Sequence, residues 1–247
     1  MGPGGDCAYN RPTVNQGETI DPGPSRRSPW GRVAEGLLAA VWVSALFASA
    51  GTVRWTAGWV YVAIVGIGLA LHRAFVAARN PRVLARRDRI GAGTKRWDAV
   101  WLAIHWPLML AAPIVAGIDT MRLHHGRLAA WMVVLGGALF AAGMALSAHA
   151  MAVNPYFEGT ARIQPDQRVI DIGLYRRLRH PGYAGLMLWA LSSPFLLRSE
   201  MAFVPAVLAA AWIALRTVLE DRMLRRELPG YEGYAQRVRW RLVPGLW

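Results

Sequence analysis

The chain has 247 residues, of which 54% are hydrophobic and only 17% are charged. Its 28 Lys and Arg residues nevertheless outnumber its 15 Asp and Glu residues, which gives a formal net charge of +13. Because soluble proteins usually contain about 25% charged residues, this composition disfavours a water-soluble enzyme and a disordered basic protein. It favours an all-α, polytopic integral membrane protein whose positive charge lies in its loops. The single cysteine, Cys7, argues against an intramolecular disulfide bond and a cysteine-based metal cluster.

Residues 1–31 are rich in glycine and proline and show no apolar periodicity, so we predict that they form a disordered N-terminal segment. A membrane-spanning helix needs about 20 predominantly apolar residues. Residues 32–153 contain four runs that reach or approach this length. We therefore predict four transmembrane helices in this region, at residues 33–50, 55–71, 99–118 and 128–153.

Two shorter apolar runs follow, at residues 183–197 and 201–215, and each has 15 residues. They are expected to form a helical hairpin, which either crosses the bilayer by extending into flanking residues or dips into it without crossing fully. In both cases the hairpin returns the chain to the side that it left. The protein then has about five to six membrane segments.

The distribution of charge among the loops predicts the orientation. In this arrangement 24 of the 28 basic residues lie on one side of the membrane, and the positive-inside rule places that side, with both termini, in the cytoplasm. The charge therefore indicates topology and contact with anionic membrane lipids, and not binding to nucleic acid. The basic residues are 27 Arg and one Lys in a chain rich in Ala and Gly. This bias suggests a GC-rich bacterial genome and hence a bacterial inner membrane.

Residues 154–247 are expected to form the catalytic region, because two polar stretches, residues 154–183 and 216–247, flank the hairpin on the same cytoplasmic face. In the first stretch, Pro181 suits the first turn of a helix, where exposed N–H groups favour an anion. Tyr175 and Tyr183 offer ring faces for stacking. The alternative is that this basic stretch is only a juxtamembrane anchor.

In the second stretch, Glu220 and Asp221 lie just after an apolar run, at the membrane boundary. Carboxylates so near the bilayer are costly unless they are paired, which makes both residues functional candidates. The alternative is a solvated helix in which Arg216 and Glu220 form an i,i+4 ion pair. The histidines show no metal-ligand spacing and the chain has no glycine-rich nucleotide-binding motif, so we predict no metal site.

Two motifs carry a family resemblance. Residues 173–185, GLYRRLRHPGYAG, are similar to the pattern G-P-Y-x3-R-H-P-x-Y-x-G, and the Glu220-Asp221 pair with the later LPGYEGYAQRVR and LVPGLW resembles the C-terminal signature of the same family. The family is that of the isoprenylcysteine carboxyl methyltransferases and phospholipid methyltransferases, and the motif match covers roughly residues 150–247. Leu174 stands where the family usually has proline, and Asp221 stands where it commonly has a second glutamate.

The resemblance implies that S-adenosylmethionine (SAM) binds in a pocket of membrane helices and the C-terminal cytoplasmic segment. It implies cofactor contacts at seven residues of the two motifs: Tyr175, Arg179, His180, Pro181, Tyr183, Glu220 and Asp221. Arg179 or the helix-start N–H groups would meet the cofactor's carboxylate, and the two acids would hold its amino group or ribose hydroxyls. Glu220 and Arg226 are the expected catalytic residues, with Arg226 holding a substrate carboxylate.

The expected function is therefore that of a SAM-dependent membrane methyltransferase, isoprenylcysteine carboxyl O-methyltransferase-like, which acts on a hydrophobic or lipid-like substrate at the cytoplasmic membrane face. One alternative is a methyltransferase that modifies nitrogen or sulfur of a phospholipid or small molecule. Another is an NADPH-dependent steroid-reductase-like enzyme, because that group also carries an R-H-P-x-Y-like motif. A non-enzymatic membrane protein is the third. The sequence leaves the methyl acceptor and the oligomeric state open.

Overall fold

Proline residues mark where several helices begin. Pro29, Pro81 and Pro181 each occupy the first position of a helix, where a residue without an N–H group loses no intrahelical hydrogen bond and its fixed φ suits the helix. The computed structural model describes residues 29–87, 93–126 and 128–247. Residues 1–28 of the predicted disordered segment lie outside this part of the chain. Residues 29–31 are helical, so the predicted end of that segment at residue 31 was wrong.

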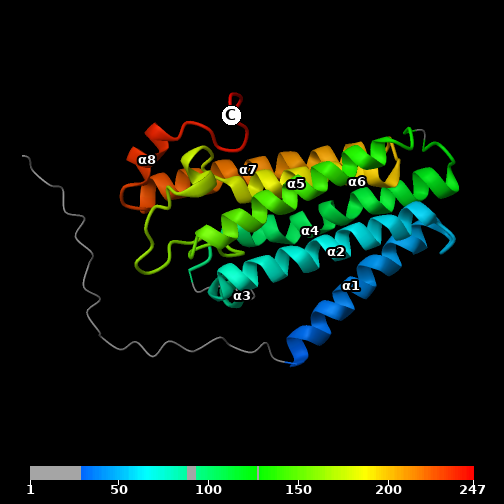
Figure 1. Cartoon of the computed structure of the whole chain (residues 1–247), viewed down its shortest axis with the longest axis horizontal. Coiled ribbons are helices and arrows are strands. Elements are labelled where there is room, and N and C mark those ends of the chain that lie inside the picture. The colour runs from blue at the N-terminus through cyan, green and yellow to red at the C-terminus, as the bar shows by residue number, and fades with distance from the viewer. Residues whose placement is uncertain (1–28, 88–92, 127) are drawn as a thin grey trace, which may run out of the picture.

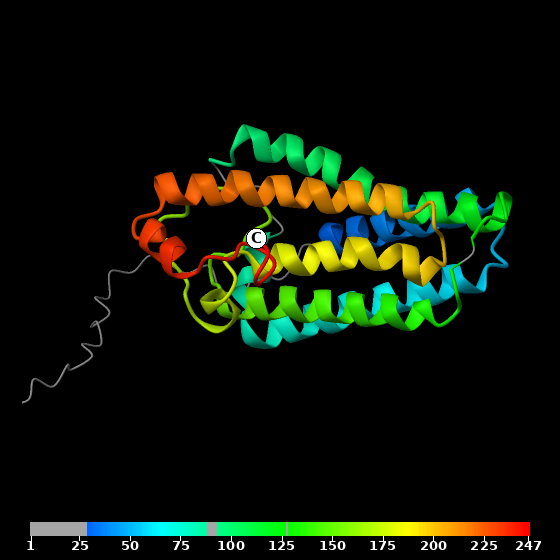
Figure 2. The same ribbon diagram turned by 90° about the horizontal axis from the view of Figure 1, so that it is seen from above.

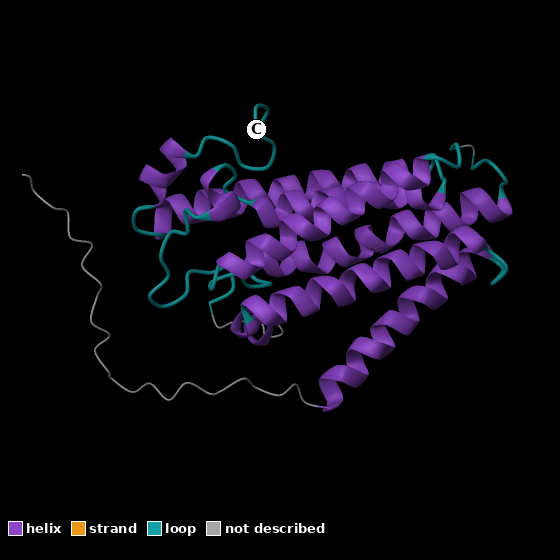
Figure 3. Ribbon diagram, in the orientation of Figure 1, coloured by secondary structure: helices purple, strands orange, loops and turns teal. Residues whose placement is uncertain are grey.

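All regular secondary structure in the described residues is helical, which confirms the all-α prediction (Figure 3). The elements, labelled in Figure 1, are α1 (Pro29–Ala50), α2 (Thr56–Arg79), α3 (Pro81–Arg87), α4 (Arg96–Gly117), the π-helix η1 (Ile118–Arg122), α5 (Met132–Val153), the 3-10 turn η2 (Gly173–Arg176), α6 (Pro181–Leu197), α7 (Phe203–Glu227) and α8 (Tyr231–Arg237).

Four helices of the described chain are long and apolar enough to cross a membrane: α2, α4 with η1, α5 and α7. Together with the apolar part of α1, Glu35–Ala50, they support an integral membrane protein. The two arms of the predicted hairpin are α6, with 17 residues, and α7, with 25 residues. The second arm thus extends well beyond the apolar run that predicted it.

Small residues bring α5 and α6 together along their lengths (Figure 2). A Cβ atom added at Gly143 of α5 would lie 2.6 Å from the carbonyl oxygen of Gly185 on α6, so neither position has room for a side chain. Helix α7 packs on α6 and on α4, while α2 packs on α5 and α1 on α4. This order places α6 between α5 and α7, with α4 against both α6 and α7.

The two ends of the helix bundle differ. At one end, short turns join α1 to α2 and α6 to α7 (Figure 1). At the other end gather α3, α8, the long loop between α5 and η2, and the C-terminal residues after α8 (Figure 1). Both polar stretches that the sequence singled out therefore lie at this second end.

Candidate functional site

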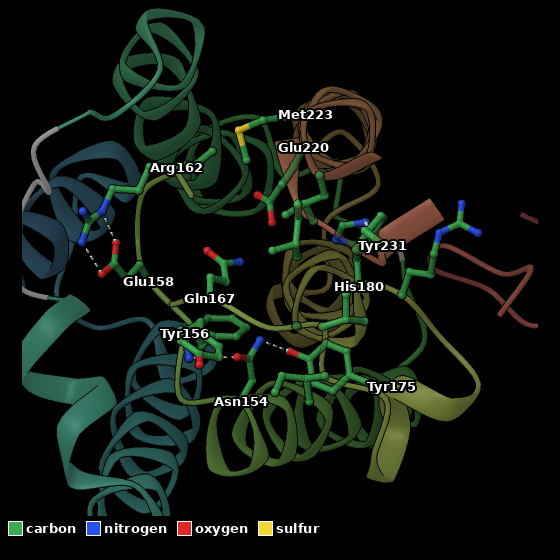
Figure 4. Close-up of a pocket in the computed structure, with 18 of the residues that line it drawn as sticks. Asn154, Tyr156, Glu158, Arg162, Gln167, Tyr175, His180, Glu220, Met223 and Tyr231 are labelled. Atoms are coloured by element: carbon green, nitrogen blue, oxygen red, sulfur yellow. Dashed lines mark hydrogen bonds and ion pairs between the residues drawn. The ribbon is translucent and has the colours of Figure 1, made fainter. Parts of the chain in front are cut away.

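A pocket lies where the loop between α5 and η2, the first turn of α6, the last turns of α7 and helix α8 meet. Its wall combines polar loop residues such as Gln167 and Arg168 with Tyr183 of α6 and with Glu220 and Met223 of α7. In Figure 4 the polar ends of Glu220 and Gln167 point into the same space. The pocket is thus formed by segments far apart in the sequence.

The C-terminal tail fixes the backbone that leads into α6. Leu178 and Trp240 form a parallel bridge. The N–H groups of Arg179 and His180 donate to the carbonyl oxygens of Trp240 (2.9 Å) and Arg241 (3.0 Å). Because α6 begins at the next residue, this pairing sets where the helix and its pocket-facing side chains start.

Asp221 is at the centre of a buried set of side chains, which we call the C-terminal cluster. Its carboxylate, 1% exposed, contacts five of them: Arg179, His180, Arg225, Tyr231 and Arg241. Arg179 binds it through Nε (2.8 Å) and Nη2 (3.1 Å). The remaining nitrogen of Arg179, Nη1, donates to the carbonyl oxygens of Ala235, Val238 and Arg239. Both charged groups are therefore already engaged within the protein.

Glu220 has a different environment, although it is adjacent to Asp221 in the sequence. It is half-buried and lines the pocket, and its Oε2 accepts a hydrogen bond from the hydroxyl of Tyr183. Its Oε1 has no hydrogen-bond partner in the part of the chain that the structure describes. The other pocket carboxylate, Glu158, forms an ion pair with Arg162 at 2.7 Å. An unpaired carboxylate that lines a pocket suits a cationic ligand.

Tyrosine rings line much of the pocket, and their hydroxyl groups are held by the protein. The hydroxyl of Tyr234 donates to the backbone oxygen of Tyr175 (2.7 Å), and that of Tyr231 donates to Asp221 (3.1 Å). Burial raises the pKa of Tyr175, of Tyr231 and of Tyr234 above the ordinary value of 10. These phenols are therefore neutral at physiological pH, and their rings offer surfaces on which a planar group can stack.

A second buried ion pair lies beside the pocket, between α4 and α7. Asp98, fully buried, pairs with Arg216, whose Nε lies 2.9 Å from Oδ1. The same carboxylate accepts a hydrogen bond from the N–H of Ala161 (2.6 Å), and Arg216 also donates to the carbonyl oxygen of Gly159 (2.9 Å). The guanidinium group lies over the ring of Trp101 at 4.3 Å. The pair thus joins two helices to the pocket loop.

Further contacts continue the same seam between α4 and α7. The indole N–H of Trp101 donates to the backbone oxygen of Trp212 (2.8 Å), and the indole N–H of Trp212 donates to that of Trp101 (3.2 Å). Near the pocket end, Lys95 pairs with Glu227 at 2.8 Å. The i,i+4 pair predicted between Arg216 and Glu220 is not the one that forms, because Arg216 is held by Asp98 instead.

The pocket brings together five of the seven cofactor residues that the family resemblance implied: Tyr175, Arg179, His180, Tyr183 and Glu220. Pro181 starts α6 next to the pocket, and Asp221 lies behind its wall in the C-terminal cluster. Arg226 is exposed in the last turn of α7, outside the pocket lining. The structure does not bring it to the other predicted residues.

Several pocket residues were not predicted from the sequence. Thr160, Gln167 and Arg168 come from the loop, where no motif marks them, and the hydroxyl of Thr160 is buried without a hydrogen-bond partner among the described residues. Asp98, which lies beside the pocket and not in its lining, carried a usable signal, because a carboxylate at the start of an apolar membrane helix is costly unless paired. No group of three or more His, Cys, Asp or Glu side chains in the described part of the chain has the arrangement of a metal site.

Part of this chain is similar in sequence to known proteins. Residues 132–226, which include α5, α6 and nearly all of α7, match the sequence model of the isoprenylcysteine carboxyl methyltransferase (ICMT) family. Two rice proteins, from Oryza sativa subsp. indica and subsp. japonica, are each described as a probable protein-S-isoprenylcysteine O-methyltransferase and are 30% identical to this chain over 77 residues. These matches cover 30% of this chain and 40% of the length of each rice protein.

A solved structure also aligns with this chain. It is that of the eukaryotic intramembrane Ras methyltransferase ICMT (isoprenylcysteine carboxyl methyltransferase), with 14% sequence identity, a TM-score of 0.45, and coverage of 85% of this chain and 86% of that one.

Proposed function

With an ICMT-family segment at residues 132–226 as the premise, we propose that this protein is a SAM-dependent membrane methyltransferase of the isoprenylcysteine carboxyl methyltransferase type. The proposed substrate is hydrophobic or lipid-like, and it enters from the membrane at the cytoplasmic face. The observation that carries the proposal is the unpaired carboxylate of Glu220 in a pocket lined by aromatic rings.

The residues of the pocket fit the chemistry of SAM, which combines an ammonium group, a sulfonium group, a carboxylate and an adenine ring. Glu220 would hold the ammonium group, because it is the pocket acid that has no ion pair within the described residues. The buried hydroxyl of Thr160, without a partner among those residues, is available to a polar group of the ligand. Rings such as those of Tyr175 and Tyr231 would stack on adenine.

The carboxylate of the cofactor needs a cation, and two arginines line the pocket without being bound to Glu158. Arg179 is engaged on all sides by the C-terminal cluster. Arg168 is exposed at the pocket and forms no ion pair within the described part of the chain. We therefore assign the cofactor carboxylate to Arg168 and give Arg179 and Asp221 the role of holding the C-terminal tail against α6.

When bound, SAM supplies a methyl group activated by its positive sulfonium. The chain's own residues have to hold that group in line with the acceptor and exclude water from it. Met223, Leu224 and Leu228 give the pocket an apolar wall on the α7 side, and Tyr183 orients Glu220 through its hydroxyl. Arg226, exposed in the last turn of α7, has no position from which to hold an acceptor in this pocket, and we do not assign it that role.

We propose a bacterial inner membrane location with both termini in the cytoplasm, because the basic residues of the polar loops lie at the same end as the pocket. In this proposal a membrane-dissolved acceptor reaches the pocket from between the apolar helices that flank it. The acceptor group in this proposal is a carboxylate, as the name of the matched family states.

Two measurements test the proposal. Isothermal titration of the purified protein in detergent with SAM and with NADPH should give binding of SAM; binding of NADPH alone would refute the proposal and favour a reductase. Native membranes that contain the protein should then transfer a radiolabelled methyl group from SAM to an extractable lipid or protein acceptor. A base-labile label indicates a methyl ester, whereas a base-stable label on nitrogen or sulfur would overturn carboxyl methylation.

A further inference from the structure

Arg216 and Glu220 are of opposite charge and lie one turn apart on α7, where side chains four residues apart are neighbours. The same helix forms such a pair five positions further on, between Asp221 and Arg225 at 3.2 Å. Arg216 instead pairs with Asp98 of α4, and Glu220 keeps one oxygen without a partner in the described chain. The contacts around Arg216 explain why it pairs with Asp98 and not with Glu220.

Asp98 holds Arg216 away from Glu220 by several contacts. Its two oxygens lie 2.9 Å from Nε and 3.2 Å from Nη2 of Arg216. The guanidinium group lies over the ring of Trp101 on one helix, and 5.2 Å from the ring centre of Tyr183 on another. The hydroxyl of that same tyrosine reaches Glu220. Arg216 and Glu220 are thus neighbours that share Tyr183.

We infer that Asp98 is a positioning residue that keeps Glu220 available to the cofactor, because it binds the arginine that would otherwise neutralise Glu220. This inference rests on the proposed function. A guanidinium group stays protonated in proteins, and a buried one left without a counter-charge is strongly unfavourable. Without the charge of Asp98, the closest remaining acid on α7 for Arg216 is Glu220, one helical turn away. The pair that the i,i+4 spacing predicts would then form and occupy the pocket carboxylate.

The test is a pair of variants in which the second change reverses the first. Asp98→Asn should weaken SAM binding, measured by isothermal titration, by about tenfold, the effect of a coupling energy in the middle of the range for residues in contact. Adding Arg216→Met removes the competing charge and leaves an apolar side chain between the two rings. The double variant should bind SAM within about threefold of the wild type. If it binds as weakly as Asp98→Asn or more weakly, the inference is wrong.

Two further variants separate positioning from folding. Asp119 is a second fully buried acid, in η1 at the opposite end of the same helical segment, where it accepts a hydrogen bond from Ser199 at 2.5 Å. Asp119→Asn should leave the affinity for SAM unchanged. Asp98→Glu keeps a carboxylate for Arg216 and should bind SAM within about threefold of the wild type. A tenfold loss in either variant would overturn the inference.

A measurement without ligand separates failure of the inference from failure of the proposed function. The melting temperatures of Arg216→Met, Glu220→Gln and the double variant are compared in the wild-type and the Asp98→Asn backgrounds. The two changes should deviate from additivity more strongly without Asp98 than with it, because Arg216 and Glu220 then form a direct ion pair. Equal non-additivity in both backgrounds would refute the inference, whereas absence of SAM binding by the wild type would refute only the proposed function.

Discussion

Glu220→Gln removes one negative charge from the pocket and keeps the size and a hydrogen-bonding side chain. Tyr183 can still donate to the new amide oxygen, so the first turn of α6 should keep its contact with α7. The substitution therefore tests the charge of Glu220 and not the packing around it. We expect weaker binding of SAM and no change in helical content.

The size of the effect follows from the environment of Glu220. Two opposite unit charges 4 Å apart attract by about 4 kcal/mol at an effective dielectric constant of about 20. Part of this attraction is offset because the half-buried carboxylate of Glu220 loses bound water when the ligand binds. Measured hydrogen bonds to charged groups accordingly contribute only about 1.5–3 kcal/mol net. We expect a loss of about 2 kcal/mol, which is an increase of about 30-fold in the Kd for SAM.

The assay is isothermal titration with two ligands. SAM carries the ammonium group that we assign to Glu220, whereas methylthioadenosine has the adenine and ribose without the amino acid part. Glu220→Gln should weaken binding of SAM and leave that of methylthioadenosine unchanged. Glu158→Gln, at the pocket acid that is already paired with Arg162, is the matched control and should change the affinity for SAM by less than about threefold. Equal losses for both ligands would refute the assignment of the ammonium group.

Three further predictions concern stability in detergent. Asp221→Asn leaves the buried guanidinium group of Arg179 without its counter-charge and should lower the free energy of unfolding by about 3–5 kcal/mol. An unchanged melting temperature would contradict this. The raised pKa of Tyr231 means that its phenol stays protonated in the folded state at a pH at which the same phenol ionises in the unfolded chain. The contribution of Tyr231 to stability is therefore fully present below about pH 10 and is lost as the pH rises above it. We therefore expect the free energy of unfolding of the wild type, measured by denaturation at pH 9–11, to fall above pH 10 by about 1.4 kcal/mol per pH unit more than that of Tyr231→Phe. Equal slopes for the two proteins would refute the effect. Gly143→Ala places a Cβ atom 2.6 Å from the carbonyl oxygen of Gly185 and should lower the free energy of unfolding by about 1–3 kcal/mol. Gly137→Ala, where nothing lies within 4 Å of the new atom, should not destabilise the protein. Equal effects of the two substitutions would argue against close packing of α5 on α6.

The helical, membrane-spanning organisation could be predicted because the length of an apolar run is a local property of the sequence. The end of α7 could not be predicted from the length of its apolar run. The apolar run ends at residue 215 where charges begin, yet the helix continues to Glu227. Arg216 and Asp221 do not end it because each has a buried partner from elsewhere in the chain. Such pairing depends on which helices pack together, and no local pattern reports it.

The candidate site was predictable to the extent that its motifs lie on neighbouring elements. The R-H-P-x-Y motif brings His180 and Tyr183 to the pocket because Pro181 starts α6 there. The role of Arg179 could not be read in the same way, since its partners come from the folded C-terminal tail. Arg226 was expected to hold a substrate carboxylate, but its side chain is turned by about 240° from that of Glu220, six residues earlier on the helix, and it is exposed in the structure.

Glu220 and Asp221 illustrate how adjacent acids acquire different roles. One residue along an α-helix rotates a side chain by about 100°, which is enough to point Glu220 at the pocket and Asp221 at the C-terminal cluster. In a chain with a net charge of +13, a carboxylate can remain open to a cationic ligand only if the nearby arginines have other partners. Asp221 binds the three arginines of the cluster, and Asp98 binds Arg216. The excess of positive charge is therefore compatible with a cation site, because Arg216 and the arginines of the C-terminal cluster are already matched to other acids.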